Sequence, residues 1–468
     1  MHKLRFAWIP CFALAIANAA TPPVRPNIVF ILADDWGWGD LSCHGNTWLK
    51  TPHLDQLAGA GTDFQQFNVL NPVCSPSRTA VMTGQYPARY SIHQHFASPA
   101  ENRARGMPDW LDPHAPMLPR LLQQAGYRTA HFGKWHLTSA QTRGAPRPET
   151  YGYDEAAVFN NGAGLPQADL HATGANTVAF INANRDRPFF INVWIHESHT
   201  PHVPTPASME RWKQLDERKQ VYAAVITDGD DTVGRILDAL KAAGVDQNTL
   251  VIFSSDNGPE ITGGPDARGR VGHYDTYYSI GETGGLRGRK RSLFEGGVRV
   301  PFIVRWPGHT PAGKIDRTTV LTAVDLLPTF CAVAGVPLPA DYHGDGESIL
   351  AALHGKPFNR SRPIFWEWLG TKAEPDWWPR LAVREGDWKL VLTDDTNRME
   401  LHRLSDDRAE STDLAKDYPD IVSRLAKLAF AWKATLPEKP DPECISKSNP
   451  ASGNSPSKKA DQAMTAPD

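Results

Sequence analysis

The chain has 468 residues, 49 Lys and Arg against 52 Asp and Glu, and five cysteines. At about 150 residues per domain, this length allows two or three domains with a large buried core. A formal net charge of −3 gives no basic footprint and argues against nucleic acid as a principal partner. Five cysteines are too few for a disulfide scaffold at this size.

Residues 1–19 have the three parts of a secretory signal peptide. A basic start precedes the apolar stretch 6–17, and Ala17-Asn18-Ala19 supplies an A-x-A cleavage site. The apolar stretch is shorter than the roughly 20 residues that span a bilayer, and an uncleaved anchor is the alternative interpretation. We therefore expect an exported protein, periplasmic or extracellular, with no membrane span after cleavage.

Residues 24–360 alternate between short apolar runs and helical patterns. The runs at 27–33, 129–132, 189–195 and 250–255 are typical of strands buried on both faces. Helical patterns lie between them at 51–60, 117–125 and 219–243. This alternation predicts an α/β domain with a large, mostly parallel mixed sheet flanked by helices.

After residue 360 the pattern changes. Strand-like runs at 364–368, 381–383 and 388–392 precede a helical pattern at 420–431. They predict a smaller α+β domain over residues 361–436, built on an antiparallel sheet. From Pro437 the chain is rich in Pro, Ser, Lys and Asp, which predicts a disordered tail over residues 437–468.

Polar clusters follow the predicted strands of the large domain. Asp34-Asp35 follows the first run and Asp256-Asn257 follows the run at 250–255. Ligands of open α/β sheets bind beyond the carboxyl ends of the strands. Three carboxylates and an amide oxygen suit Ca²⁺ or Mg²⁺ better than zinc. Taken singly, each acidic pair is more typical of a helix cap or turn, but together they favour a metal site.

One segment carries a family signature. Cys74-x-Pro76-x-Arg78, followed by Thr83-Gly84, resembles the motif of the type I, formylglycine-dependent sulfatases of the alkaline phosphatase-like superfamily. Alone, such a motif would equally fit a buried free thiol near a helix start. Four further blocks match the family in order, at residues 27–35, 133–136, 255–258 and 295–301. The N-terminal half is most similar to arylsulfatase and N-acetylgalactosamine-6-sulfatase members.

The resemblance implies a modified residue and a metal ion. Relatives convert the signature cysteine to Cα-formylglycine, so Cys74 is expected to be a substrate of a formylglycine-generating enzyme. In the family, one hydroxyl of the hydrated residue attacks sulfur, and the second later reforms the aldehyde and expels sulfate. The family's metal ligands fall on Asp34, Asp35, Asp256 and Asn257, with residue 74 as a further ligand. The ion is usually Ca²⁺, and Mg²⁺ fits the same ligands.

The resemblance also assigns catalytic residues around residue 74. Arg78 lies one helical turn after Cys74 and would stabilise the aldehyde hydrate. Lys134 and His136 match the family pair that contacts the diol and the sulfate. Lys290 matches the lysine that binds sulfate near the leaving oxygen.

Two assignments near this set are less direct. His202 matches the histidine that protonates the leaving oxygen, with His199 as the alternative. A histidine in this segment could also be a hydrogen-bonded core residue. Lys290 is flanked by Arg289 and Arg291, which indicate either a strongly anionic substrate or an exposed basic turn.

The sequence therefore predicts an exported sulfatase that acts on a sulfated saccharide or another sulfate ester. The alternative is a phosphonate or phosphate monoester hydrolase that uses the same modified cysteine. A non-catalytic binding protein that kept the fold would be expected to lack at least one of four residues, Cys74, Arg78, Lys134 or Lys290. All four are present.

Overall fold

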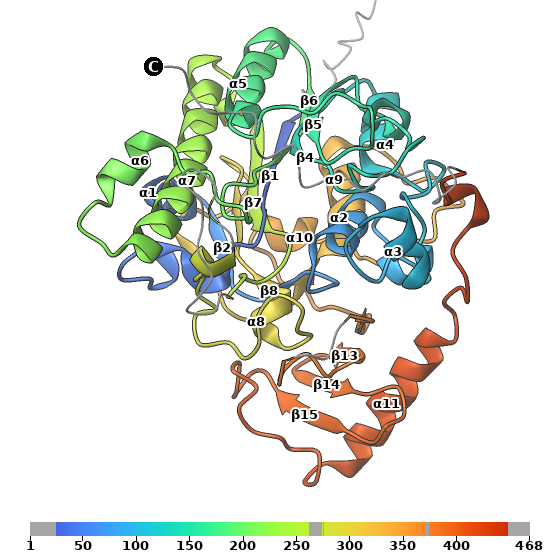
Figure 1. The fold of residues 1–468 in the computed structure, drawn as a ribbon. Helices are drawn as coiled ribbons and strands as arrows, with labels where there is room; N and C mark the ends of the chain where they lie inside the picture. The colour runs from blue at the N-terminus through green and yellow to red at the C-terminus, as the bar shows by residue number, and fades with distance from the viewer. Residues whose placement is uncertain (1–24, 262–273, 275, 371–373, 448–468) are drawn as a thin grey trace, which may run out of the picture.

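The computed structural model describes residues 25–261, 274, 276–370 and 374–447. The predicted signal peptide, and residues 448–468 of the predicted tail, lie outside the described residues. The large domain is built on an eight-stranded sheet in the order β10-β2-β9-β7-β1-β6-β4-β5, and a separate four-stranded sheet follows it in the chain (Figure 1). The predicted fold class is confirmed.

Parallel strands form the centre and one edge of the large sheet. β1 (Asn27–Ala33) lies between β6 (Phe189–Trp194) and β7 (Thr249–Ser255), and pairs parallel with both. Beyond β6 come β4 (Arg128–Lys134) and the edge strand β5 (Glu155–Phe159), also parallel. Every residue of β1, β6 and β7 is buried, as expected for continuous apolar runs with helices on both faces.

Short strands make the other edge of the sheet mixed. β9 (Phe302–Arg305) pairs antiparallel with both β7 and β2 (Thr62–Phe64), and β10 (Lys314–Asp316) pairs parallel with β2. A small three-stranded sheet lies apart from this one; its strands are β11 (Leu321–Thr322), β3 (Phe67–Asn68) and β8 (Arg299–Val300).

The alternation of side chains along β1 divides the core into two layers. Phe30 and Leu32 belong to one buried apolar cluster, whereas Val29 and Ile31 belong to the other. The second layer is closed by residues of three helices, α1 (Pro52–Gly59), α5 (Ala172–Asn184) and α7 (Glu217–Ala242). The first is closed by α2 (Cys74–Thr83), α4 (Leu118–Gln124) and α9 (Leu326–Ala334). Four other α-helices of the described chain are short: α3 (Pro99–Ala104), α6 (Pro206–Arg211), α8 (Glu295–Val298) and α10 (Leu350–Leu353).

The C-terminal sheet is antiparallel and is covered by one helix. Its strands are β12 (Ile364–Glu367), β13 (Leu381–Glu385), β14 (Trp388–Leu392) and β15 (Met399–Arg403), and α11 (Pro419–Lys433) contacts β13 and β14. A fully buried ion pair joins this sheet to the large domain, because Lys389 Nζ lies 2.8 Å from Glu295 Oε1. Among the described residues, we find no helix with the length and apolar character needed to cross a membrane.

The first part of the predicted disordered tail is ordered. The described chain continues to residue 447 and includes a 3-10 turn at Pro442–Cys444. Asp109 anchors it at two points: its backbone N–H donates to Cys444 O (2.8 Å), and its Oδ2 accepts the Ser446 N–H (2.7 Å). The composition of this segment predicts disorder because the segment has no apolar pattern. A few specific hydrogen bonds hold it in place instead.

Candidate active site

The two acidic pairs meet at the carboxyl end of the sheet. Because β1 and β7 are parallel with Ala33 opposite Ser255, Asp34-Asp35 and Asp256-Asn257 leave neighbouring strands at the same level. The Asp35 N–H donates to Asp256 Oδ1 (3.2 Å), and Asn257 Nδ2 donates to Asp35 Oδ1 (2.7 Å). All four side chains are buried. The structure thus brings together the four residues that the sequence predicts as metal ligands.

Helix α2 places Cys74 and Arg78 beside this cluster. Cys74 is the first residue of the helix, and Arg78 follows one turn later on the same face. The Arg78 guanidinium donates from Nη2 to Asp256 Oδ2 (2.6 Å) and lies 3.4 Å from Asp34 Oδ1. Its Cζ also stacks 4.8 Å from the Trp194 ring centroid. Arg78 is fully buried, so these two carboxylates compensate its charge.

Two lysines from separate segments of the chain contact the carboxylates. Lys134, at the end of β4, donates to Asp34 Oδ2 (2.6 Å), and Lys290 donates to Asp35 Oδ2 (2.6 Å). Burial lowers the pKa of Lys290, but the negative charges of Asp35 and Glu260 outweigh burial and raise that pKa above its ordinary value. Lys290 therefore remains cationic at neutral pH.

Charge compensation is uneven between the two aspartates nearest Cys74. Burial raises the pKa of Asp34, but nearby cations, Lys134 above all, outweigh it and hold that pKa well below its ordinary value. For Asp256, burial and the negative charge of Asp34 raise the pKa well above its ordinary value. The surroundings therefore disfavour the ionised form of Asp256, and a bound cation would stabilise that form.

The donor atoms fit a hard divalent cation. Asp34, Asp256 and Cys74 can each offer one ligand atom with these atoms all within 4.8 Å of one another. Asp34 Oδ1 and Asn257 Oδ1 are buried and accept no hydrogen bond from any residue that the structure describes. Within the described chain, Asp34 Oδ1 has only the ion-pair contact with Arg78, 3.4 Å away, and a buried oxygen that accepts no hydrogen bond costs free energy, which a bound ion would offset. Carboxylate and amide oxygens favour Ca²⁺ or Mg²⁺.

The two candidate histidines lie in different surroundings. His199 lines the cavity that contains Cys74, and its Nε2 is 3.9 Å from Asp35 Oδ2. His202 is fully buried, lies outside the described cavity lining and has its Nε2 3.3 Å from Ser279 Oγ. Burial lowers the pKa of His202 to about 4. The position of His202 therefore does not support the general-acid role that we predict for it from sequence.

His136 lies at the cavity wall, as predicted. Its Nε2 is 3.0 Å from the backbone oxygen of Phe96, and its buried Nδ1 has no partner among the described residues. Burial, followed by the positive charge of Lys134, lowers the pKa of His136 well below its ordinary value. The imidazole is consequently neutral in the free protein.

A cavity of about 470 Å³ opens at this cluster, large enough for a sugar as well as a sulfate. Its lining comprises Cys74, His95, Lys134, His136, Ala140, Phe159, Asn160, Gln167, His196, His199, Thr200, Lys290 and Arg291. Several of these residues, including His95, Asn160 and Gln167, are not among the sequence-predicted site residues. They come from irregular loops, where no spacing rule identifies the inward-facing position.

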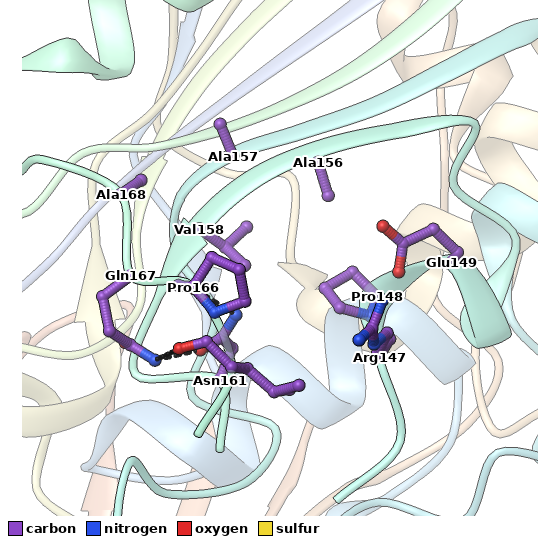
Figure 2. Close-up of a pocket in the computed structure, with 11 residues that line it drawn as sticks. Arg147, Pro148, Glu149, Ala156, Ala157, Val158, Asn161, Pro166, Gln167 and Ala168 are labelled. Carbon is purple, nitrogen blue, oxygen red and sulfur yellow. Dashed lines mark hydrogen bonds between the residues drawn. The ribbon is translucent and has the colours of Figure 1, made fainter. Parts of the chain in front are cut away.

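A loop at one wall is shared with a neighbouring cavity of about 270 Å³ (Figure 2). Gln167 lines both cavities. Its Oε1 accepts the Asn160 N–H (2.7 Å) and its Nε2 donates to Asn161 Oδ1, a bond drawn in Figure 2. Gln167 therefore holds together a loop whose residues line both cavities.

The match to a family model agrees with this geometry. The model described as Sulfatase matches residues 26–336, more than half of the chain. The chain belongs to the sulfatase family. A second model, described as N-sulphoglucosamine sulphohydrolase, C-terminal, matches residues 283–431 of this sulfatase and so includes the C-terminal sheet.

Relatives of this sulfatase include enzymes with named substrates. An N-acetylgalactosamine-6-O-sulfatase of Bacteroides thetaiotaomicron is 27% identical, over 87% of this chain and 93% of its own length. The human N-acetylgalactosamine-6-sulfatase is 32% identical, over 75% of this chain and 69% of its own. A crystal structure of Ps i-CgsB in complex with k-i-k-neocarrahexaose superposes with a TM-score of 0.74 at 26% identity, covering 87% of this chain and 92% of that one.

Proposed function

We propose that this sulfatase is exported and hydrolyses sulfate monoesters of saccharides, with Cα-formylglycine at position 74 and a bound Ca²⁺. The observation that carries the proposal is the convergence of Cys74, two buried carboxylates and the cationic side chains of Lys134 and Lys290 at one cavity. A sulfate ester is anionic, and its hydrolysis needs fixed positive charge around it.

Asp34, Asp35, Asp256 and Asn257, together with residue 74, would hold the ion, and Mg²⁺ would suit the same atoms. When bound, the ion supplies a Lewis acid and a template for the sulfate oxygens. The modified residue, when hydrated, supplies a hydroxyl nucleophile and a second hydroxyl for sulfate release. The modification makes a formylglycine-generating enzyme a partner during maturation.

The chain's own cations would bind and orient the ester. Lys134 and Lys290 line the cavity and present ammonium groups to the sulfate, with His136 at the same wall. Arg78 is too deeply buried to reach far into the cavity, and its bond to Asp256 Oδ2 orients that carboxylate. Positioning of this kind allows binding energy to act on the reacting group.

We assign protonation of the leaving oxygen to His199. Its Nδ1 lies 2.6 Å from the Thr200 carbonyl oxygen, which can only accept, so Nδ1 carries a proton and Nε2 is the atom that exchanges one. Burial, and next the charge of Lys134, lower the pKa of His199 well below its ordinary value. A bound sulfate adds negative charge nearby and favours the protonated form, which is then a strong acid.

Three features support a sulfated saccharide as substrate and an exported protein. The relatives described above include enzymes named for N-acetylgalactosamine 6-sulfate. The cavity of about 470 Å³ has room for a sugar beyond the sulfate. The first 19 residues have the pattern of a signal peptide, which favours contact with extracellular polysaccharides.

The test is a comparison of substrates on protein that was co-expressed with a formylglycine-generating enzyme. Hydrolysis of an aryl sulfate and of a panel of sulfated hexosamines is expected, with Cys74→Ala as the inactive control. Faster turnover of an aryl phosphonate than of the aryl sulfate would favour the phosphonate hydrolase alternative. No turnover of any ester by fully modified protein would favour a binding protein.

A further inference from the structure

Arg291 lines the catalytic cavity but is held by partners of its own. It follows Lys290 directly, and its backbone N–H donates to the Pro72 carbonyl oxygen (2.9 Å), two residues before Cys74. Its φ is +74°, a left-handed conformation that is uncommon for a non-glycine residue. The backbone therefore fixes Arg291 at the cavity wall instead of leaving it on an exposed turn.

Two contacts orient the Arg291 guanidinium. Its Nη1 donates to both oxygens of the buried Glu260 (2.8 and 2.7 Å), and its Cζ lies 5.4 Å from the ring centroid of Trp377. Trp377 lies between β12 and β13 of the C-terminal sheet, and Arg289 also packs on it, with its Cζ 5.2 Å from the same centroid. Trp377 thus packs against both arginines, and a guanidinium held this way loses little freedom on binding a ligand.

The guanidinium keeps free donors. Nε and Nη2 of Arg291 form no hydrogen bond or ion pair with the residues that the structure describes, although its side chain is only 28% exposed. Glu260 also lies 3.8 Å from Lys290 Nζ, so this one carboxylate is shared between two cations. Arg291 therefore offers both charge and hydrogen-bond donors to a ligand in the cavity.

The scissile sulfate does not account for this residue. The proposed function already places that sulfate against Lys134 and Lys290, which contact Asp34 and Asp35. Arg291 contacts neither aspartate among the described interactions; its carboxylate partner is Glu260. The planar fork of arginine suits carboxylate and sulfate groups, which it can bind through two parallel hydrogen bonds.

We infer that Arg291 is a specificity residue that binds a second anionic group of the substrate. The substrate class is then a sulfated saccharide with an additional carboxylate or sulfate, on the same sugar or on its neighbour. This inference rests on the proposed sulfatase activity and deepens it. It does not depend on which hexosamine is the preferred sugar.

The experiment compares kcat/KM for three substrates: a monosulfated hexosamine, its disulfated form, and the same monosulfated hexosamine linked to a hexuronate. The hexosamine is chosen as one that the wild-type enzyme hydrolyses. We expect at least one doubly anionic substrate to be preferred over the singly anionic one. Arg291→Gln should reduce that preference by roughly 10- to 100-fold, mainly through KM, because charge-assisted hydrogen bonds are lost. If Arg291→Gln loses the preference for the disulfated substrate, the second group is a sulfate. If it loses the preference for the hexuronate-linked substrate, the second group is a carboxylate.

Arg289→Gln is the matched control. Arg289 stacks on the same tryptophan and pairs with Glu374 (3.5 Å), but it does not line the described cavity. This variant should keep the wild-type preference. Arg291→Lys retains the charge without the fork and should have an intermediate preference, and melting temperatures confirm that each variant is folded.

Two results would overturn the inference. One is a wild-type enzyme that hydrolyses all three substrates with equal kcat/KM. The other is a loss of kcat/KM in Arg291→Gln that is the same for all three substrates, or that also occurs in Arg289→Gln. Both leave the sulfatase proposal intact, whereas failure of the modified wild-type enzyme on every sulfate ester would contradict that proposal itself.

Discussion

Replacing His199 by alanine should produce a defect that depends on the leaving group. A saccharide alkoxide is a poor leaving group and needs a proton, whereas 4-nitrophenolate is a stable anion that leaves without one. General acid catalysis contributes typically 10²–10⁴-fold, or about 3–5 kcal/mol of transition-state stabilisation. His199 can supply this proton because it lines the cavity and its Nδ1 is committed to Thr200 O, which leaves Nε2 to exchange a proton.

The assay measures kcat for a sulfated hexosamine and for 4-nitrophenyl sulfate with the same enzyme preparation. We expect His199→Ala to slow the sugar sulfate by roughly 10³-fold and the aryl sulfate by less than about 10-fold. His202→Ala is the comparison variant. It removes a fully buried imidazole next to Ser279, so it should lower the melting temperature and affect both substrates to a similar degree.

Equal slowing of both substrates by His199→Ala would refute the assignment. A leaving-group dependence in His202→Ala, with none in His199→Ala, would return the role to His202, as we predict from sequence.

Four further predictions concern the ion pair of Glu295, its pH dependence, the C-terminal segment and the metal ion. Lys389→Met removes the cation that pairs with two buried carboxylates, Glu295 and Glu410, and should lower the free energy of unfolding by about 3–5 kcal/mol in urea titrations, although Arg299 Nε remains 3.5 Å from Glu295. Burial raises the pKa of Glu295, but Lys389 and neighbouring arginines outweigh it and lower that pKa to about 2; the stabilisation is therefore present above pH ~4.5 and lost as the pH falls toward 2. Glu295→Gln should flatten this pH dependence. Asp109→Ala removes the acceptor of the Ser446 N–H and should expose residues 437–447 to limited proteolysis. Chelation should abolish activity, and added Ca²⁺ should restore it.

Each of these has a contradicting outcome. An unchanged urea midpoint in Lys389→Met would mean that water reaches Glu295. A stability curve that stays flat between pH 5 and pH 2 in the wild-type protein would exclude a depressed pKa for Glu295. Unaltered cleavage in Asp109→Ala would show that the segment is held by other contacts. Full activity after exhaustive chelation would exclude a metal requirement.

The central strands could be predicted because they are buried on both faces. β1, β6 and β7 lie in the middle of the sheet, where every position is buried and most are apolar, so the runs stand out. The edge strand β5 (Glu155–Phe159) was not predicted, because its small, partly exposed residues have no distinctive pattern. The three-residue strands β2 and β10 at the other edge are too short for periodicity to show.

The site could be predicted where its residues follow strands or a motif, and not where they lie in loops. Asp34 and Asp256 follow adjacent parallel strands, so their approach follows from topology alone. His199 and His202 lie in one short segment after β6, and only the three-dimensional structure distinguishes the cavity side from the interior. The contact of Trp377 with Arg291 joins two domains, and no local sequence pattern reports such a contact.

The most direct test of the account measures specific activity against the fraction of residue 74 that is present as formylglycine. Preparations made with different amounts of the modifying enzyme provide the range, and mass spectrometry of the peptide containing residue 74 provides the fraction. Release of sulfate from a sulfated hexosamine should rise linearly with that fraction and pass through zero for unmodified Cys74. Activity that is independent of the modification, or absent from fully modified and calcium-loaded protein, would contradict the account.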